Sequence, residues 1–348
     1  MAVLRVKKFW RRAVVKQVNV LVTGSGSLYG LAIVRSLVNG PLNCRVVACD
    51  TDAMTLGLYL AHDGYMVPPA ADSKKWLRKI IDICHREDIH GIIVGSSHEI
   101  KPFVENKEYI NQQTGAKVFI HSSEVINICN DKWLTAKFLK ENGFYYPNTL
   151  RWPEDKEMLP AFVEKVQFPL VAKPRIGAGS KGLALLSSLS QLIEFVKDKS
   201  KYIIQEFIPD GDGEFTVGVA IGTEGRVLSS IALKRNLQDG MTMSALVDDY
   251  SYICNYCQQV AKKISAYGPI NLQLRLKNNH PYIFEINPRF SSSTGMRIAL
   301  GVNEAELLIR HEILGQKVTP PQVNKAAVIR QYTDYVIPTE LISKYTSS

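Results

Sequence analysis

Three side chains with hard oxygen donors, Gln273, Glu285 and Asn287, lie in the stretch 269–289, PINLQLRLKNNHPYIFEINPR. Apolar and polar residues alternate on both sides of a central turn, which predicts an antiparallel β-hairpin. One carboxylate with amide oxygens, and no histidine or cysteine, suits Mg²⁺ that takes its other ligands from phosphate and water. Arg289 follows Asn287 by two residues, and its guanidinium can fork onto phosphate. We therefore predict a metal site with a phosphoryl-transfer arginine beside it.

The register of the hairpin decides whether these oxygens meet. If residues 278–280 form a three-residue turn, Gln273 lies opposite Glu285, and Asn287 lies opposite Asn271. Cβ atoms in such cross-strand pairs are about 4.5–5.5 Å apart, close enough to share a ligand. An exposed polar sheet face is the alternative, but a carboxylate between large apolar residues is costly to bury unpaired. The same alternation assigns the apolar face of the returning strand to Tyr282, Phe284 and Ile286.

The rest of the chain must position this hairpin. From residue 18 to about 125, short β-type runs alternate with amphipathic helical runs, which predicts a Rossmann-like α/β domain with a parallel sheet. A small α+β unit is expected over 126–205, and a larger antiparallel unit over 206–348. The fold class is thus α/β followed by α+β. Residues 1–17 form a basic arm before the first strand.

The net charge of +9 is concentrated in that arm, whose Lys and Arg residues carry six of the charges. We therefore expect no nucleic-acid partner. The arm also holds apolar residues and could contact an acidic membrane or a protein weakly; a solvated terminus is the alternative. No run reaches the roughly 18–20 apolar residues needed to cross a bilayer, and the N-terminus lacks the apolar section of a signal peptide, so we expect a cytoplasmic protein.

The stretch 19–30, NVLVTGSGSLYG, passes from an apolar run into glycines, as in the first turn of a dinucleotide-binding fold. Tyr29 occupies the third glycine position of the spacing G-x-G-x-x-G, and Asp50 follows at the distance that NAD binding would require. The same layout arises in any first βαβ unit. The stretch is therefore either a nicotinamide site or the wall of a substrate pocket, which would use Gly24, Ser25 and Gly26.

Four segments in order along the chain carry a resemblance to a known family: Asn130-Asp131-Lys132, FPLVAKPRIGAGSKGL, IIQEFI and GEFTVGV. With the hairpin, they resemble the ATP-grasp enzymes, and in particular one synthetase half of the carbamoyl-phosphate synthase large subunit. The likeness extends from about residue 19 to 334. It implies a Rossmann-like pre-ATP-grasp domain followed by a two-part ATP-grasp fold.

The resemblance also implies roles for individual residues. Lys132 and Lys173 would hold the nucleotide phosphates, with Lys173 and Arg289 acting in catalysis. The glycines of the loop would let its N–H groups meet oxyanions, although alone the loop reads equally as a mobile connection. Glu206 would bind ribose hydroxyls, and the metal ligands would be the three hairpin residues. The implied nucleotide-binding set is Lys132, Lys173, Gly177, Gly179, Ser180, Lys181, Gly182, Gln205, Glu206, Phe207, Ile208 and Glu214.

The implied activity is that of a ligase dependent on ATP and Mg²⁺, with Mn²⁺ as a substitute. Such an enzyme phosphorylates a carboxylic acid and passes the acyl group to an amine or thiol, releasing ADP and phosphate. The chain has one synthetase-like unit where the carbamoyl-phosphate enzyme has two, and Ser292 stands where that enzyme has a second arginine. Its carbamoyl-phosphate chemistry is therefore not expected. The substrate pocket would instead use Lys234, Arg235 and Arg297.

Two other functions remain open from the sequence. A nicotinamide-dependent oxidoreductase would explain the glycine stretch and Asp50, but it gives no reason for the hairpin oxygens to converge. A nucleotide-binding scaffold without catalysis, held at a membrane by the arm, is the other alternative. The acid and its acceptor are not identified by the sequence, and a homodimer is compatible with it.

Overall fold

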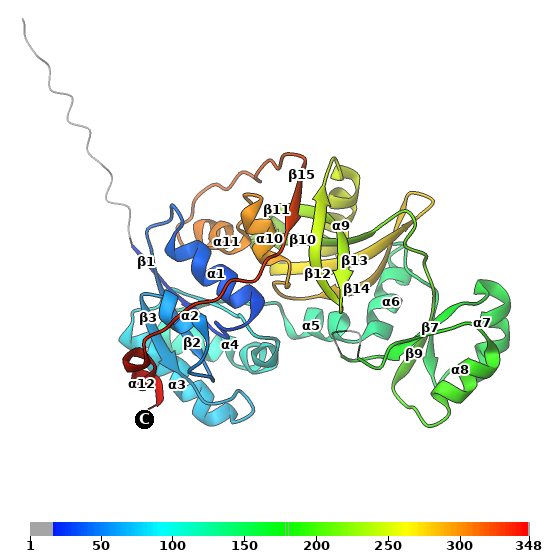
Figure 1. Ribbon diagram of the computed structural model, residues 1–348, viewed down its shortest axis with the longest axis horizontal. Helices are drawn as coiled ribbons and strands as arrows, with labels where there is room; N and C mark the ends of the chain where they lie inside the picture. The colour runs from blue at the N-terminus through cyan, green and yellow to red at the C-terminus, as the bar shows by residue number, and fades with distance from the viewer. Residues whose placement is uncertain (1–16, 178, 180, 347–348) are drawn as a thin grey trace, which may run out of the picture.

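The computed structural model describes residues 17–177, 179 and 181–346. The basic arm at 1–16 and Ser180 therefore lie outside the described residues. The described residues form three sheets, which follow along the chain as a parallel sheet, a small antiparallel sheet and a large antiparallel sheet. In Figure 1 the parallel sheet is on the left, the large sheet is in the middle and the small sheet is on the right. Within the described residues, no helix is long and apolar enough to span a membrane.

The first sheet is parallel throughout, with strand order β3-β2-β1-β4-β5, which confirms the predicted Rossmann-like arrangement. Its strands are almost continuously apolar because helices cover both faces. The strands are β1 (Val18–Val22), β2 (Cys44–Asp50), β3 (Asp63–Met66), β4 (Gly91–Ile93) and β5 (Lys117–Phe119). The helical elements are α1 (Leu28–Val38), α2 (Leu56–Leu60), α3 (Ser73–Arg86), the 3₁₀ turn η1 (Ser97–Glu99) and α4 (Ile100–Thr114).

The small sheet is antiparallel, with order β6-β9-β7-β8, and has its own apolar core beneath α7 and α8. Leu170 and Ile204 of the sheet meet Leu192 of α8 and Leu159 of α7 in that core. The elements are β6 (Thr149–Trp152), η2 (Lys156–Met158), α7 (Leu159–Val166), β7 (Leu170–Pro174), β8 (Ala184–Leu186), α8 (Leu189–Val196) and β9 (Tyr202–Glu206).

The large sheet has the order β14-β13-β10-β11-β12-β15 and is antiparallel. Its strands are β10 (Glu214–Ile221), β11 (Val227–Gln238), β12 (Met241–Val247), β13 (Gly268–Lys277), β14 (His280–Asn287) and β15 (Ala326–Ile329). The remaining helical elements are α5 (Ser123–Asn130), α6 (Lys132–Glu141), η3 (Thr223–Gly225), α9 (Ser251–Lys263), α10 (Thr294–Ala299), α11 (Glu304–Glu312) and α12 (Thr339–Thr346). Helices α5 and α6 fall in the range predicted for the small unit, but Val125 and Leu139 pack into the core of the large sheet with α9.

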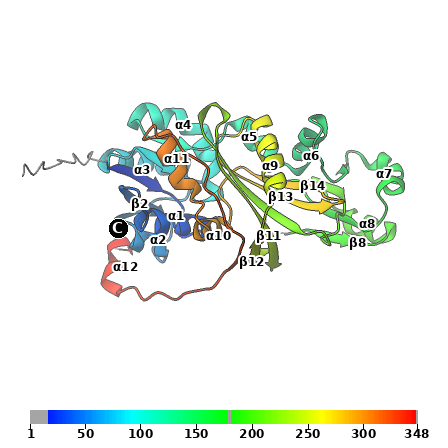
Figure 2. The ribbon, with the colours of Figure 1, turned by 90° about the horizontal axis from the view of Figure 1, so that it is seen from above.

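The parallel domain and the large sheet share one apolar cluster. Ile33 and Leu37 of α1 lie in this cluster with Leu308 of α11 and with Leu228 of β11. The chain also returns to the parallel domain after β15, as the red segment in Figures 1 and 2 shows. There, Tyr345 of α12 packs edge to face on Tyr59. These two parts are therefore joined by a common core, whereas the small sheet has a separate one.

The β13–β14 hairpin reaches the predicted register by a route that the sequence analysis did not foresee. Lys277 pairs with His280, so the turn has two residues, Asn278 and Asn279, with φ of 52° and 61°. Positive φ at both positions is what a type I′ hairpin turn requires. The predicted three-residue turn is therefore wrong by one residue.

A β-bulge further along the hairpin compensates for the shorter turn and returns the pairing to the predicted register. The register shifts between Gln273 and Leu274, because Leu274 pairs with Ile283 whereas Gln273 pairs with Glu285. Gln273 thus lies opposite Glu285, and Asn271 lies opposite Asn287, as predicted. The bulge also changes the faces of β14: Ile283 and Ile286 are buried in the core, while Tyr282 and Phe284, which were predicted there, are only partly buried.

Arg297 of α10 forms an internal ion pair. Its side chain is 1% exposed and lies 3.1 Å from the Oε2 atom of Glu304, which is equally buried. It also donates to Asn271 Oδ1 at 3.0 Å and to Thr294 Oγ1 at 3.1 Å. A Cβ atom on Gly218 of β10 would come within 2.6 Å of both members of the pair, so this strand needs a glycine there. Arg297 therefore joins α10 and α11 to the large sheet, which corrects its expected role as a substrate contact.

We predict that Arg297→Met lowers the free energy of unfolding by about 3–5 kcal/mol, because Glu304 would keep a buried charge without a partner. Urea denaturation followed by circular dichroism measures this change. Lys137→Ala is the control: it breaks an exposed pair with Glu141, whose side chains are 54% and 59% exposed, and should cost at most about 1 kcal/mol. A stability loss no larger than that of the control would contradict the structural role of Arg297.

Candidate functional site

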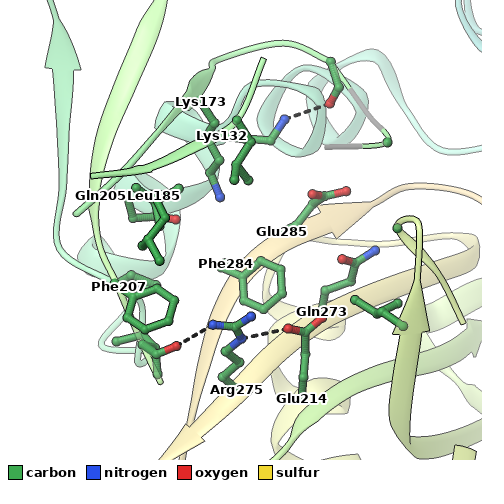
Figure 3. Close-up of a pocket in the computed structure, with 18 of the residues that line it drawn as sticks. Lys132, Lys173, Leu185, Gln205, Phe207, Glu214, Gln273, Arg275, Phe284 and Glu285 are labelled. Carbon is green, nitrogen blue, oxygen red and sulfur yellow. Dashed lines mark hydrogen bonds and ion pairs between the residues drawn. The ribbon is translucent and has the colours of Figure 1, made fainter. Parts of the chain in front are cut away.

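A cavity of about 410 Å³ lies between the small sheet and the large sheet. Residues of β7, β8 and β9 form one wall, and residues of β10, β11, β13 and β14 form the other (Figure 3). This volume is in the range of small-molecule sites. Of the predicted nucleotide-binding residues that the structure describes, all but Gly182 line the cavity.

Two lysines with lowered pKa values lie at one end of this cavity. Lys173, in β7, is 6% exposed and has no carboxylate partner within 4 Å among the described residues. Burial lowers the pKa of Lys173 to about 8; Glu285 opposes this shift, whereas Lys132 and Arg275 add to it. Burial also lowers the pKa of Lys132, against the attraction of Glu285 and Asp131. The end of the cavity therefore carries positive charge that the described side chains do not neutralise.

Lys132 is held in place by the start of α6 and by the glycine loop. The Asp131 carboxylate caps the helix by accepting from the N–H of Trp133, and it also pairs with Arg175 at 2.5 Å. Lys132 Nζ donates to the Gly177 carbonyl oxygen at 2.8 Å (Figure 3). Because this acceptor belongs to a loop, the lysine can exchange it for another oxygen without losing a buried ion pair.

The glycine loop has the backbone that the sequence predicts. Gly177, Gly179 and Gly182 have φ of 143°, 69° and 73°, which side chains rarely allow. A Cβ atom would meet nothing at Gly177 or Gly179, so the backbone conformation there, and not space, requires glycine. Lys181 lines the cavity from this loop.

The other end of the cavity is largely apolar. Leu185 of β8 and Phe207 face Phe284 of β14 across it (Figure 3). Phe284 is the residue that the bulge removes from the core, so its place could not be read from strict alternation. The backbone just after β9 joins this end, where Arg275 donates to the Ile208 carbonyl at 2.7 Å.

Glu206 and Gln205 lie in the cavity wall, but their polar atoms have partners. The Glu206 carboxylate pairs with Lys277 at 2.7 Å and accepts from the Asn148 side chain at 2.6 Å. Gln205 Nε2 donates to Thr149 Oγ1 at 2.8 Å. In this structure both side chains fasten the strand β9 to its neighbours.

Two of the three predicted metal ligands, Glu285 and Asn287, share a hydrogen bond, and Gln273 lies opposite Glu285 in the hairpin. Asn287 Nδ2 donates to Glu285 Oε1 at 2.9 Å, and Arg289 Nη2 donates to Asn287 Oδ1 at 3.3 Å. Gln273 and Glu285 line the cavity. The described residues hold no cluster of three or more His, Cys, Asp or Glu side chains that could bind a metal. One carboxylate with two amides fits Mg²⁺ only when another ligand, such as phosphate, completes its coordination.

Glu214 is the centre of a second network on the same wall. Its Oε1 accepts from Arg235 at 2.5 Å, and its Oε2 accepts from Arg275 at 2.7 Å. Arg235 also donates to Gln273 Oε1 at 2.9 Å. The sequence analysis did not assign Arg275 to the site, although the alternation of the hairpin places it on the same face as Gln273.

Two other predicted residues lie outside the cavity wall. Lys234 precedes Arg235 on β11, so its side chain leaves the opposite face, and it lies beside Gly213. Arg289 donates to the Phe290 carbonyl at 2.8 Å and lies 5.6 Å from the ring of Tyr29 in α1. Lys234 is therefore not part of the wall of this cavity, and its contact with a substrate stays a prediction. Arg289 is at the boundary with the parallel domain.

The glycines of the first stretch are explained by packing within the parallel domain. A Cβ atom on Gly24 would lie 2.5 Å from that of Ser96, and one on Gly26 would lie 2.4 Å from Thr55. Ser25 is fully buried, so it cannot contact a substrate as predicted without a movement of the loop. The Asp50 carboxylate accepts from the Gly26 N–H at 2.8 Å, so it fastens this loop, and the nicotinamide alternative is not favoured.

Comparisons with known proteins agree with this arrangement. Residues 198–335 match a family model described as ATP-grasp in the biosynthetic pathway with Ter operon. The carbamoyl phosphate synthase large chain of Thermoanaerobacter sp. is 26% identical over 232 residues, which are 59% of this chain and 20% of that protein. The chain thus spans about a fifth of the length of this curated relative.

Solved structures share the fold over most of the chain. N5-carboxyaminoimidazole synthetase from Staphylococcus aureus, solved with ADP, has a TM-score of 0.70 at 16% identity, covering 90% of this chain and 82% of that one. The biotin carboxylase domain of 2-oxoglutarate carboxylase from Hydrogenobacter thermophilus, solved with MgADP, ADP and bicarbonate, has a TM-score of 0.65 at 16% identity, covering 86% and 70%. Because the likeness spans the parallel domain and both walls of the cavity, the chain shares the fold of these solved proteins, and residues 198–335 match an ATP-grasp family model.

Proposed function

We propose that this protein is an ATP- and Mg²⁺-dependent ligase that activates a small carboxylic acid as an acyl phosphate for attack by an amine or thiol. The observation that carries the proposal is the uncompensated positive charge of Lys132 and Lys173 opposite Glu285, in a cavity of nucleotide size. Buried charges need partners, and a polyphosphate is the partner that fits two lysines and a nearby cation. The ADP and MgADP held by the similar solved proteins support this proposal.

The cavity would orient ATP by its two unlike ends. The nucleobase would enter the apolar end between Leu185, Phe207 and Phe284, and the phosphates would meet the lysines. Lys181 and the N–H groups of the glycine loop would cover the phosphates and exclude water. Mg²⁺, held by Gln273, Glu285 and Asn287, would supply charge neutralisation on the transferring phosphoryl group.

The reaction would proceed in two displacements. A carboxylate oxygen of the substrate attacks the terminal phosphorus of ATP, and ADP leaves. The amine or thiol then attacks the acyl carbon, and inorganic phosphate leaves. Neither step needs a nucleophilic side chain, so the protein's residues act by binding, alignment and charge. Arg289, beside Tyr29 at the boundary with the parallel domain, and Arg235 are the basic residues available to the acid.

We predict that Glu285→Gln lowers the rate of ADP formation by at least about a hundredfold, because the metal site loses its only carboxylate. The measurement is phosphate and ADP release from ATP with a panel of carboxylic acids and pooled amines and thiols. Glu194→Gln is the control, since Glu194 lies on α8 in an exposed pair with Lys197 and does not line the cavity. Formation of AMP and pyrophosphate would overturn the proposal.

We predict that nucleotide binding weakens as the pH rises through the pKa of Lys173, which is about 8. The pKa lies below the usual lysine value, so the charged form is lost on the alkaline side. Between pH 7.5 and 9 the charged fraction falls from about three quarters to about a tenth, which raises the Kd for ADP up to about eightfold. Calorimetric titration at several pH values measures this change.

Lys173→Arg provides the matched comparison for this pH dependence. Arginine stays charged over the whole range, so the variant should show a flatter profile than the wild-type protein. Lys197→Arg, on the surface of the small sheet's domain, should keep the wild-type profile. Equal slopes in the wild-type protein and Lys173→Arg would show that Lys173 does not bind the phosphates.

A further inference from the structure

The Gln273 oxygen that is assigned to the metal is already in contact with a cation. Arg235 Nη2 donates to Gln273 Oε1 at 2.9 Å, and the Arg235 side chain is only 8% exposed. A divalent ion at that oxygen would therefore lie within a few ångströms of a buried guanidinium. Two like charges at this distance repel each other strongly where water is largely excluded.

Arg235 has a second anchor that does not depend on Gln273. Its Nε and Nη2 atoms contact Glu214 Oε1 at 3.0 and 2.5 Å. The guanidinium can therefore turn away from Gln273 and remain paired with Glu214. Arg275 occupies the other oxygen of the same carboxylate and does not touch Gln273. Of these two arginines, only Arg235 links the Glu214 network to the metal-binding oxygens.

The backbone beside Arg235 is irregular. The pairing of β11 with β12 shifts register between Asn236 and Leu237, one residue beyond Arg235. Such a bulge interrupts the ladder and re-aims the side chains next to it. Arg235 thus stands one pair before the last regular pair, Asn236 with Ser244, and it lines the cavity.

We propose that Arg235 competes with the divalent cation for Gln273 in the nucleotide-free protein and releases this oxygen when nucleotide phosphates enter the cavity. The phosphates supply negative charge that attracts the guanidinium and also completes the coordination of the metal. Metal and nucleotide therefore bind cooperatively, and the metal alone binds weakly. This inference rests on the proposed function and adds to it a residue that sets the order of loading.

The test is Mn²⁺ binding, measured by the electron paramagnetic resonance signal of free Mn²⁺, with and without a non-hydrolysable ATP analogue. Without the analogue, Arg235→Gln should bind Mn²⁺ about tenfold more tightly than the wild-type protein, since one charge-assisted hydrogen bond no longer competes. With the analogue present, the difference should shrink to about twofold or less. Adding Gln273→Leu to Arg235→Gln should abolish the gain.

Arg275→Gln is the matched control, because it removes the same charge from the same carboxylate but leaves the Arg235–Gln273 bond in place. It should change Mn²⁺ binding less than about twofold if local competition, and not overall charge, governs the site. Arg235→Lys keeps the charge but cannot span both partners with a planar fork, so it should lie between wild type and Arg235→Gln. This conservative variant also tests the inference if Arg235→Gln does not fold.

The outcomes separate this inference from the proposed function. Equal Mn²⁺ affinities for Arg235→Gln and Arg275→Gln, or no Mn²⁺ binding by any variant, would overturn the competition. If the proteins bind the ATP analogue in that case, the proposed function survives without it. If neither the wild-type protein nor any folded variant binds the analogue, the proposed function itself fails.

Discussion

The site is organised around two lysines that are buried without a carboxylate partner among the described residues. Burial lowers the pKa of Lys173 to about 8 and also lowers the pKa of Lys132. Because buried charges are costly without partners, this end of the cavity favours an anionic ligand. The glycine loop, the apolar residues and the oxygen donors line the same cavity.

The cavity that contains these lysines has two walls, and the two walls belong to sheets that are packed differently. The large sheet and the parallel domain are joined by a common core and by the C-terminal helix α12, while the small sheet has a core of its own. Lys173 belongs to the small sheet, and Glu285 belongs to the large one. Lys173 and Glu285 are therefore carried by sheets with separate cores, which the ion pair between Glu206 and Lys277 also links.

The hairpin shows how a correct site can follow from an incorrect detail. The turn at Asn278 and Asn279 is one residue shorter than predicted, and the bulge at Phe284 takes up the difference, so Gln273 still pairs with Glu285. The predicted register at Gln273 was correct because the turn was counted one residue too long and the bulge was not foreseen, and these two errors cancel. The bulge could not be foreseen, since a single additional residue leaves no signature in an alternating pattern. Phe284 was missed as a cavity residue for that reason, whereas Arg275 was on the correct face by alternation and was not assigned.

The sequence by itself predicted the parallel domain and the glycine backbone of the loop, because periodicity and the freedom of glycine to adopt positive φ are local properties. The resemblance to the ATP-grasp enzymes supplied many of the residues that line the cavity. Only the tertiary structure decided which charged side chains are buried and paired with one another inside the protein. Arg297 and Ser25 are polar in sequence but fully buried, and α5 and α6 belong to the core of the large sheet. Burial and pairing depend on neighbours distant along the chain: Arg297 is paired with Glu304 and Asn271, and Arg235 with Glu214 and Gln273. No local pattern encodes those contacts.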